Sequence, residues 1–153
     1  MKNKYMHDNP NRTTPIGLSR YAREFFNCAM ITDEKLGHQL NVAPIPVMYL
    51  IAHSIELCLK SYLLFKGVPL IDLKRKYGHD LIKCFKKAKE LELDKIVNLN
   101  KIEQDAFVIL NELYSTKQLN YIVTGVNFFP NFELILLVSK KLLDSICPLV
   151  GYK

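Results

Sequence analysis

Three titratable side chains interrupt the apolar stretch AHSIELCLKSYLLFKG, which covers residues 52–67. His53, Glu56 and Lys60 follow one another at helical intervals of three and four residues, so a helix would place them on one edge. An imidazole, a carboxylate and an ammonium group on one edge could line a small cleft for a phosphate or a nucleotide. They could also form an internal polar network, because polar groups are buried in proteins only when they have partners.

His79 and Asp80 open the next amphipathic segment, HDLIKCFKKAKEL, and are further candidates for the same site or network. We favour the network, which would fix the helix around Glu56 against the start of this segment. The reason is that Glu56 and Lys60 have the spacing and order of a favourable helical ion pair. Asp80 also has a structural role available, since a carboxylate at a helix start complements the helix dipole.

Basic residues give this chain a formal charge of +6, which permits an acidic partner such as RNA. The candidates for nucleic-acid contact fall in two short groups: Lys74, Arg75 and Lys76, then Lys83, Lys86 and Lys87. The same residues also fit an ordinary solvated helix face. Glu90 and Glu92 dilute the second group, so the sequence leaves both interpretations open.

Neither a metal nor a cofactor is expected. No Cys-x-x-Cys pair, metal-binding His pair, glycine-rich phosphate loop or hydrolase elbow occurs in the sequence. Several charged residues interrupt the two long apolar segments, 44–65 and 128–150, so we expect no membrane association through them. The polar N-terminal sequence MKNKYMHDNPNRTTP has no apolar signal core, and we expect a cytoplasmic protein.

Helical periodicity runs through most of the chain and predicts an all-α protein. We expect a four- to five-helix up-and-down bundle, with a helical turn near 70–76 and irregular chain over 115–130. The predicted organisation is a flexible arm over 1–14, one helical domain over 15–148 and a tail over 149–153. The predicted helices cover residues 15–36, 46–66, 79–91, 102–114 and 131–146.

The order of two motifs resembles the HEPN superfamily of small helical bundles. A helix SIELCLKSYLLFKG is followed by a short loop and the helix entry YGHDLIKCFKKA, and the closing LNYIVTGVNFFPNFELILLVSKKLL is similar to the last segment of the family. The residues that carry the resemblance are Glu56, Leu57, Lys60, Gly67, His79, Asp80 and Leu81. The resemblance implies a HEPN-like bundle that is commonly dimeric. Known members include metal-independent ribonucleases, partners of nucleotidyltransferases and binding modules without catalysis.

The ribonuclease members carry Arg, four to six residues, then His near the start of the last helix. This chain has Asn120 and Asn127 in that region, and asparagine supplies neither positive charge nor a proton-transfer group near neutral pH. We therefore expect a non-catalytic HEPN-like binding or partner module, beside a nucleotidyltransferase or in a toxin–antitoxin or defence system. The alternative is a divergent metal-independent ribonuclease for single-stranded RNA that uses His79 with Arg75 or Lys60.

A surplus of apolar residues in the last predicted helix indicates an interface. Its sequence, FELILLVSKKLL, has more apolar positions than one inward face requires. We expect a twofold homodimer built partly from this helix and partly from the turn at Phe128 and Phe129.

Overall fold

The computed structural model describes residue 9 and residues 12–153, and these residues form a helical bundle without a named β-strand. This confirms the all-α prediction. Most of the predicted N-terminal arm, residues 1–8, 10 and 11, lies outside the described residues. In chain order the elements are α1 (Pro15–Leu36), α2 (Ile45–Phe65), α3 (Leu70–Asp72), the π-helical turn η2 (Leu73–Tyr77), α4 (Leu81–Glu90), the 3₁₀ turn η3 (Leu93–Lys95), α5 (Lys101–Ser115) and α6 (Phe132–Leu149).

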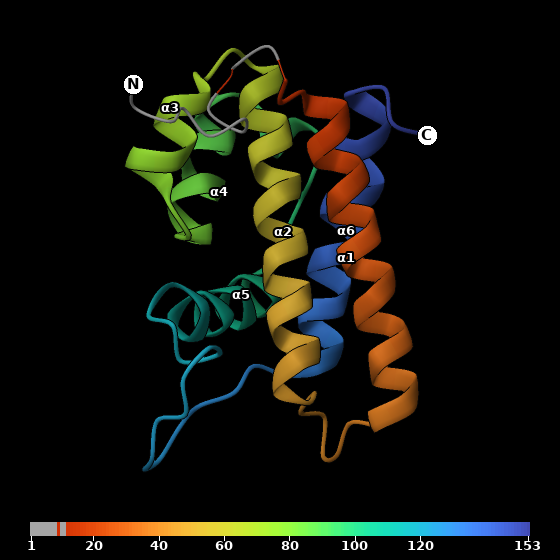
Figure 1. The fold of residues 1–153 in the computed structure, drawn as a ribbon, viewed down its shortest axis with the longest axis vertical. Coiled ribbons are helices and arrows are strands. Elements are labelled where there is room, and N and C mark those ends of the chain that lie inside the picture. The colour runs from red at the N-terminus through yellow and green to blue at the C-terminus, as the bar shows by residue number, and fades with distance from the viewer. Residues whose placement is uncertain (1–8, 10–11) are drawn as a thin grey trace, which may run out of the picture.

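Helix α2 is the centre of the bundle. It contacts α1, α4, α5 and α6, and α1 runs antiparallel to α2 and α6 along the long axis (Figure 1). Helix α4 lies on the side of α2 away from α1, and α5 lies across the lower part of the molecule (Figure 1). A helix enclosed on several sides must be apolar over most of its surface, and α2 is.

Within the described part of the chain, α2 is the one helix long and apolar enough to cross a bilayer by length and composition. The rest of the structure buries 67% of its most apolar window, as is usual for the central helix of a packed core. The apolar character of α2 is therefore accounted for by its central place in the bundle.

Local capping groups set where the helices begin. Thr14 accepts a hydrogen bond from the Gly17 amide at 3.1 Å, and Pro15 stands at the first helical position of α1. At α5, Asn100 and Glu103 form a reciprocal capping box. The predicted third helix is shorter than expected at its start, because Asp80 is the capping residue of α4 and His79 precedes the helix.

Helix α6 continues past its predicted end at residue 146. Pro148 lies inside the helix, which ends at Leu149. A proline in the last turn removes only its own amide donor. The following amides still bond back to the helix, with Val150 N donating to Ile146 O at 3.1 Å and Tyr152 N to Cys147 O at 2.9 Å. Val150 is buried as a result.

Candidate functional site

Glu56 is the centre of a buried hydrogen-bond network that joins α2, the entry to α4, and α5. It is 3% exposed. Lys60 Nζ lies 2.6 Å from Glu56 Oε1, and His79 Nδ1 lies 2.9 Å from Glu56 Oε2. The Tyr114 hydroxyl donates to the same Oε2 at 2.5 Å. The predicted contact of Glu56 with Lys60 and a histidine is present, and Tyr114 is an additional member.

The surroundings of Glu56 keep it ionised. Burial disfavours the charged carboxylate, but His53, the Lys60 ammonium and the Tyr114 hydroxyl outweigh burial and hold the pKa of Glu56 well below its usual range. Burial and the negative charge of Glu56 raise the pKa of Tyr114, so its hydroxyl stays protonated. The network is therefore an anionic carboxylate surrounded by donors.

The directions of the hydrogen bonds follow from this charge state. An ionised carboxylate only accepts, so Nδ1 of His79 must carry a proton. Tyr114 has one hydroxyl proton, which is directed to Glu56. His53 Nδ1, 3.0 Å from the Tyr114 oxygen, must then be the donor of that bond. The chain of bonds thus runs from His53 through Tyr114 to Glu56.

His53 differs from its predicted place. Its Nδ1 lies 3.9 Å from Glu56 Oε2, beyond hydrogen-bond distance, and it reaches the carboxylate through Tyr114. The ring packs edge-on against Phe25 with centroids 4.5 Å apart. His53 lies on the same edge of α2 as Glu56, as its spacing predicted. Its imidazole is nevertheless closer to the hydroxyl of Tyr114 in α5 than to the carboxylate of Glu56.

Asp80 does not belong to the Glu56 network, which corrects the sequence-based assignment. Its carboxylate caps α4, accepting from the Lys83 amide at 3.0 Å, and also accepts from Asn111 Nδ2 at 3.3 Å. Asn111 Oδ1 accepts in turn from the Leu81 amide at 2.7 Å. A capping side chain turns back toward the first amides of its own helix, so Asp80 joins α4 to α5 instead.

His79 is the member of the network with the geometry of a proton-transfer group. Its side chain is 52% exposed, while its Nδ1 is held by the buried Glu56. A carboxylate that holds one ring nitrogen fixes the tautomer and leaves the other nitrogen for a reacting group. Lys60 is bound to the second oxygen of the same carboxylate, and Arg75 lies exposed on η2.

Two of the network residues also line a cavity of about 730 Å³. Glu56 and Lys60 form part of its wall, together with residues from the start of α1, from α3 and from η2. The described lining includes neither His53 nor His79. The predicted site is therefore divided between this cavity and the half-exposed imidazole of His79.

The residues predicted to contact nucleic acid lie on η2 and α4. On α4 the apolar side is buried, so its lysines lie on the outer side. Lys87 Nζ is 2.9 Å from Glu90 Oε2, and Lys83 Nζ is 3.7 Å from Asp80 Oδ2. On η2, Lys76 lies over the Tyr77 ring at 5.5 Å. The acidic neighbours on α4 reduce the positive charge that this face presents to a phosphate backbone.

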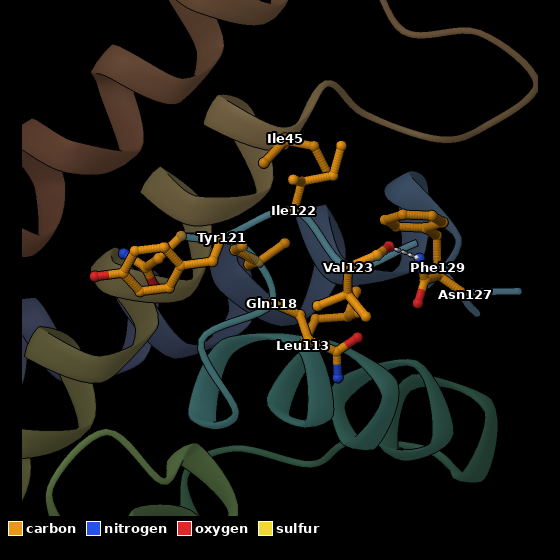
Figure 2. Close-up of a pocket in the computed structure, with 10 residues that line it drawn as sticks. Ile45, Leu113, Gln118, Tyr121, Ile122, Val123, Asn127 and Phe129 are labelled. Carbon is orange, nitrogen blue, oxygen red and sulfur yellow. Dashed lines mark hydrogen bonds between the residues drawn. The ribbon is translucent and has the colours of Figure 1, made fainter. Parts of the chain in front are cut away.

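The loop that contains Asn120 and Asn127 is mainly apolar. A cavity of about 250 Å³ lies there, and its described lining residues carry no charge. Asn120 is exposed, and Asn127 Nδ2 donates to the Val123 carbonyl at 2.9 Å, with Phe129 beside it (Figure 2). Asn127 thus supports the turn, and the cavity is lined mainly by Ile45, Leu113, Ile122 and Val123 (Figure 2).

Comparison of the chain with protein-family models, curated proteins and solved structures gives no match. The HEPN resemblance is therefore a hypothesis based on the order of short motifs. Any functional proposal for this chain must therefore be argued from the contacts of Glu56 and from the exposed apolar and cationic side chains.

Proposed function

We propose that this chain is a non-catalytic, HEPN-like partner module that forms a homodimer through the loop between α5 and α6. The supporting observation is a group of exposed apolar side chains in that loop, here named the loop surface: Tyr121, Ile122, Val126 and Phe128. Ile122 is 94% exposed and Phe128 is 78% exposed. Water contact with side chains of this size is unfavourable, and apolar surface gathered in one place is typical of an interface.

The predicted dimer interface combined the last helix with the turn at Phe128 and Phe129, and we propose the loop as its main part. The apolar residues that formed the surplus in the α6 sequence mostly pack inside the chain, including Phe132, Ile135, Val138, Leu142 and Leu143. Leu137 is the exposed member of that set. Helices α1, α2 and α5 pack against more than one side of α6. Most of its apolar side chains are therefore buried within a single copy of the chain.

The charge distribution favours a second copy of the chain as the occupant of the loop surface. Segment 118–131, QLNYIVTGVNFFPN, contains no charged residue, whereas the whole chain has a formal charge of +6. Two copies repel each other over most of their surfaces but can approach here without placing like charges together.

The shape of the same region is also compatible with self-association. The cavity of about 250 Å³ adjoins one of about 450 Å³, and both share Leu113, Gln118 and Asn127 in their linings. A twofold axis brings the same patch of both copies together, so projecting side chains such as Phe128 and Ile122 would meet the hollows of the partner. The HEPN resemblance further favours a companion nucleotidyltransferase, or a toxin–antitoxin or defence system, as the setting.

Sedimentation equilibrium at roughly 50 μM tests the proposal, since interfaces of standard size are occupied at such concentrations. We expect a dimer for the wild type and a monomer for the Ile122→Asp/Phe128→Asp double variant. Ile31→Asp, which places one negative charge on an exposed position of α1, should remain dimeric. A monomeric wild type, or a monomeric Ile31→Asp variant beside a dimeric double variant, would contradict the proposal.

A specific observation also supports a second candidate, the divergent ribonuclease. His79 is half-exposed and its Nδ1 is held by a buried carboxylate, which is how a general base is oriented. Lys60 or Arg75 would then have to stabilise the charge that develops on the phosphate. The absence of the family's Arg and His from the loop region makes this the weaker candidate.

Incubation with single-stranded RNA in EDTA distinguishes the two candidates. For the partner module we expect no cleavage by the wild-type protein. Cleavage that is lost in His79→Ala and retained in Asn120→Ala, a change at an exposed asparagine of the loop, would instead establish the ribonuclease.

A further inference from the structure

Two buried cysteines lie where α1, α2 and α6 pack together. Cys58 is in α2 and Cys147 is near the end of α6, and neither residue is more than 1% exposed. The Cys58 thiol is in hydrogen-bonding contact with Cys147. Cys147 Sγ also lies 3.9 Å from the carbonyl oxygen of Ser19 in α1. Two neighbouring sulfur atoms inside a fold are the arrangement from which a disulfide forms.

Serine hydrogen bonds between α1 and α2 fix the direction in which Cys58 faces. Ser54 Oγ donates to the carbonyl of Ala22 at 2.7 Å, and Ser61 Oγ lies 2.7 Å from Ser19 Oγ. Cys58 is four positions after Ser54 and three before Ser61, so it lies on the same edge of α2. This edge packs against the stretch of α1 that the other cysteine contacts. The helix packing therefore brings the two sulfur atoms together.

The surroundings of Cys147 favour its thiolate. The hydrogen bond from the Cys58 thiol, together with Ser19 and the Arg23 guanidinium, holds the pKa of Cys147 below its usual value, although burial opposes this. Burial raises the pKa of Cys58, so that thiol keeps its proton. Thiolates are the reactive form toward oxidants. Cys147 is therefore the sulfur that an oxidant would attack, and Cys58 is its neighbouring thiol.

Arg23 connects the pair to the surface of the molecule. Its side chain is 29% exposed, and its Nη2 lies 2.7 Å from Asp144 Oδ1. Arg23 lines a cavity of about 350 Å³ together with Pro148, the residue after Cys147. A cavity of this size beside Cys147 has room for a molecule as small as hydrogen peroxide.

The other two cysteines of the chain are placed differently. Cys28 is exposed on α1, and Cys84 is buried in α4. Burial raises the pKa of Cys84 to about 12, so its thiol stays protonated and unreactive at neutral pH. These two cysteines are internal references for the reactivity of the buried pair.

We propose that Cys58 and Cys147 form a reversible disulfide when the protein meets a peroxide. The Cys147 thiolate attacks one peroxide oxygen, the O–O bond breaks, and the second oxygen leaves as hydroxide, which takes up a proton to become water. The Cys58 thiol then attacks the sulfur of the resulting sulfenic acid. The S–S bond forms as the hydroxyl group leaves with the Cys58 proton as a second water.

In this sequence the two sulfurs together lose two electrons and the peroxide is reduced to two waters. The disulfide joins α2 to the last turns of α6, and exchange with a small thiol restores the reduced pair. The site is separate from the loop surface proposed for dimerisation and does not depend on it.

Peroxide treatment of the reduced full chain tests the disulfide. The remaining thiols are alkylated in denaturant, and the peptides are mapped by mass spectrometry without reduction. We expect a linked pair of peptides that contains Cys58 and Cys147, a free Cys84, and loss of the link after dithiothreitol. The Cys28→Ser variant, which lacks the exposed thiol, should form the same link. Cys58→Ser should instead accumulate a sulfenic acid at Cys147, which dimedone traps.

Arg23→Ala tests the positioning role of the guanidinium. Disulfide formation should slow at least about threefold at neutral pH, because less of Cys147 is then thiolate. Arg20→Ala removes an arginine of the same helix that pairs with Glu24, and it should keep the wild-type rate.

Two results would overturn the proposal. One is a wild-type protein in which peroxide oxidises Cys28 completely while Cys58 and Cys147 stay unlinked. The other is oxidation of Cys84 at the same rate as Cys147, which would mean that the buried pair has no special reactivity.

Discussion

Tyr114 in α5 donates a 2.5 Å hydrogen bond to Glu56 in α2, although the two residues are 58 positions apart in the sequence. The same carboxylate holds Lys60 from its own helix and His79 from the entry to α4. One ionised side chain therefore connects three parts of the bundle, and it also forms part of the wall of the cavity of about 730 Å³.

Glu56→Ala should lower the free energy of unfolding by about 3–5 kcal/mol, because it leaves the mostly buried Lys60 ammonium without its partner. Lys83→Ala, which removes an exposed lysine from α4, should change stability by less than about 0.5 kcal/mol. Urea unfolding followed by circular dichroism measures both values. A Glu56→Ala protein as stable as the wild type would mean that the hydrogen-bond network around Glu56 does not stabilise the fold.

Acid should lower the stability of the wild-type protein, because Glu56 becomes protonated. The pKa of this carboxyl is lower in the folded state than its unfolded value of about 4.3, so the folded state favours the ionised form. Its contribution to stability is full above the unfolded pKa and is lost as the pH falls toward the folded pKa. The melting temperature should therefore drop as the pH falls below about 4.5.

Glu56→Gln provides the test of this pH dependence, because it cannot lose a proton. Its melting temperature should fall less steeply with acid than that of the wild type over the same interval. Glu90→Gln, at a surface ion pair with Lys87, should change the slope less than Glu56→Gln does, because exposed ion pairs contribute little to stability. Identical slopes for wild type and Glu56→Gln would show that the ionisation of Glu56 does not stabilise the fold.

Tyr114→Phe removes one hydroxyl and leaves the ring in place. The change leaves His53 Nδ1 without its acceptor and Glu56 Oε2 without one donor, so we expect a loss of about 1–3 kcal/mol. Tyr121→Phe, at a tyrosine that is 74% exposed, should be neutral. Thermal unfolding of the two variants makes the comparison, and equal melting temperatures would argue against a structural role for the Tyr114 hydroxyl.

Asn111→Ala should loosen the start of α4. Its Oδ1 accepts from the Leu81 amide and its Nδ2 donates to Asp80, so the change removes an acceptor from the first turn at a cost of about 1 kcal/mol. Hydrogen exchange should speed up at Leu81 and its neighbours. Asn27→Ala, at an exposed asparagine of α1, should leave these amides protected, and unchanged exchange in Asn111→Ala would remove Asn111 from the capping role.

The sequence by itself determined the features that depend on residues close along the chain. Apolar periodicity and the Thr14–Pro15 pair located α1, and the spacing of Glu56 and Lys60 predicted the ion pair inside α2. These features are local, because helix hydrogen bonds and side-chain pairs on one helix span only three or four residues.

Only the tertiary structure decided which groups meet across the bundle. Tyr114 has the pattern of an ordinary inward-facing helix residue, and nothing in its neighbours along the chain indicates that its hydroxyl reaches Glu56. Asp80 was assigned to the network, yet its capping geometry directs it to the α4 amides and Asn111. The apolar count of α6 likewise did not reveal that its own chain covers most of this helix, while Ile122 and Phe128 remain exposed in the loop before it. The physical reason is that a periodic pattern reports which side of a helix is apolar, whereas the packing of distant helices decides what covers that side and which polar atoms lie within bonding distance.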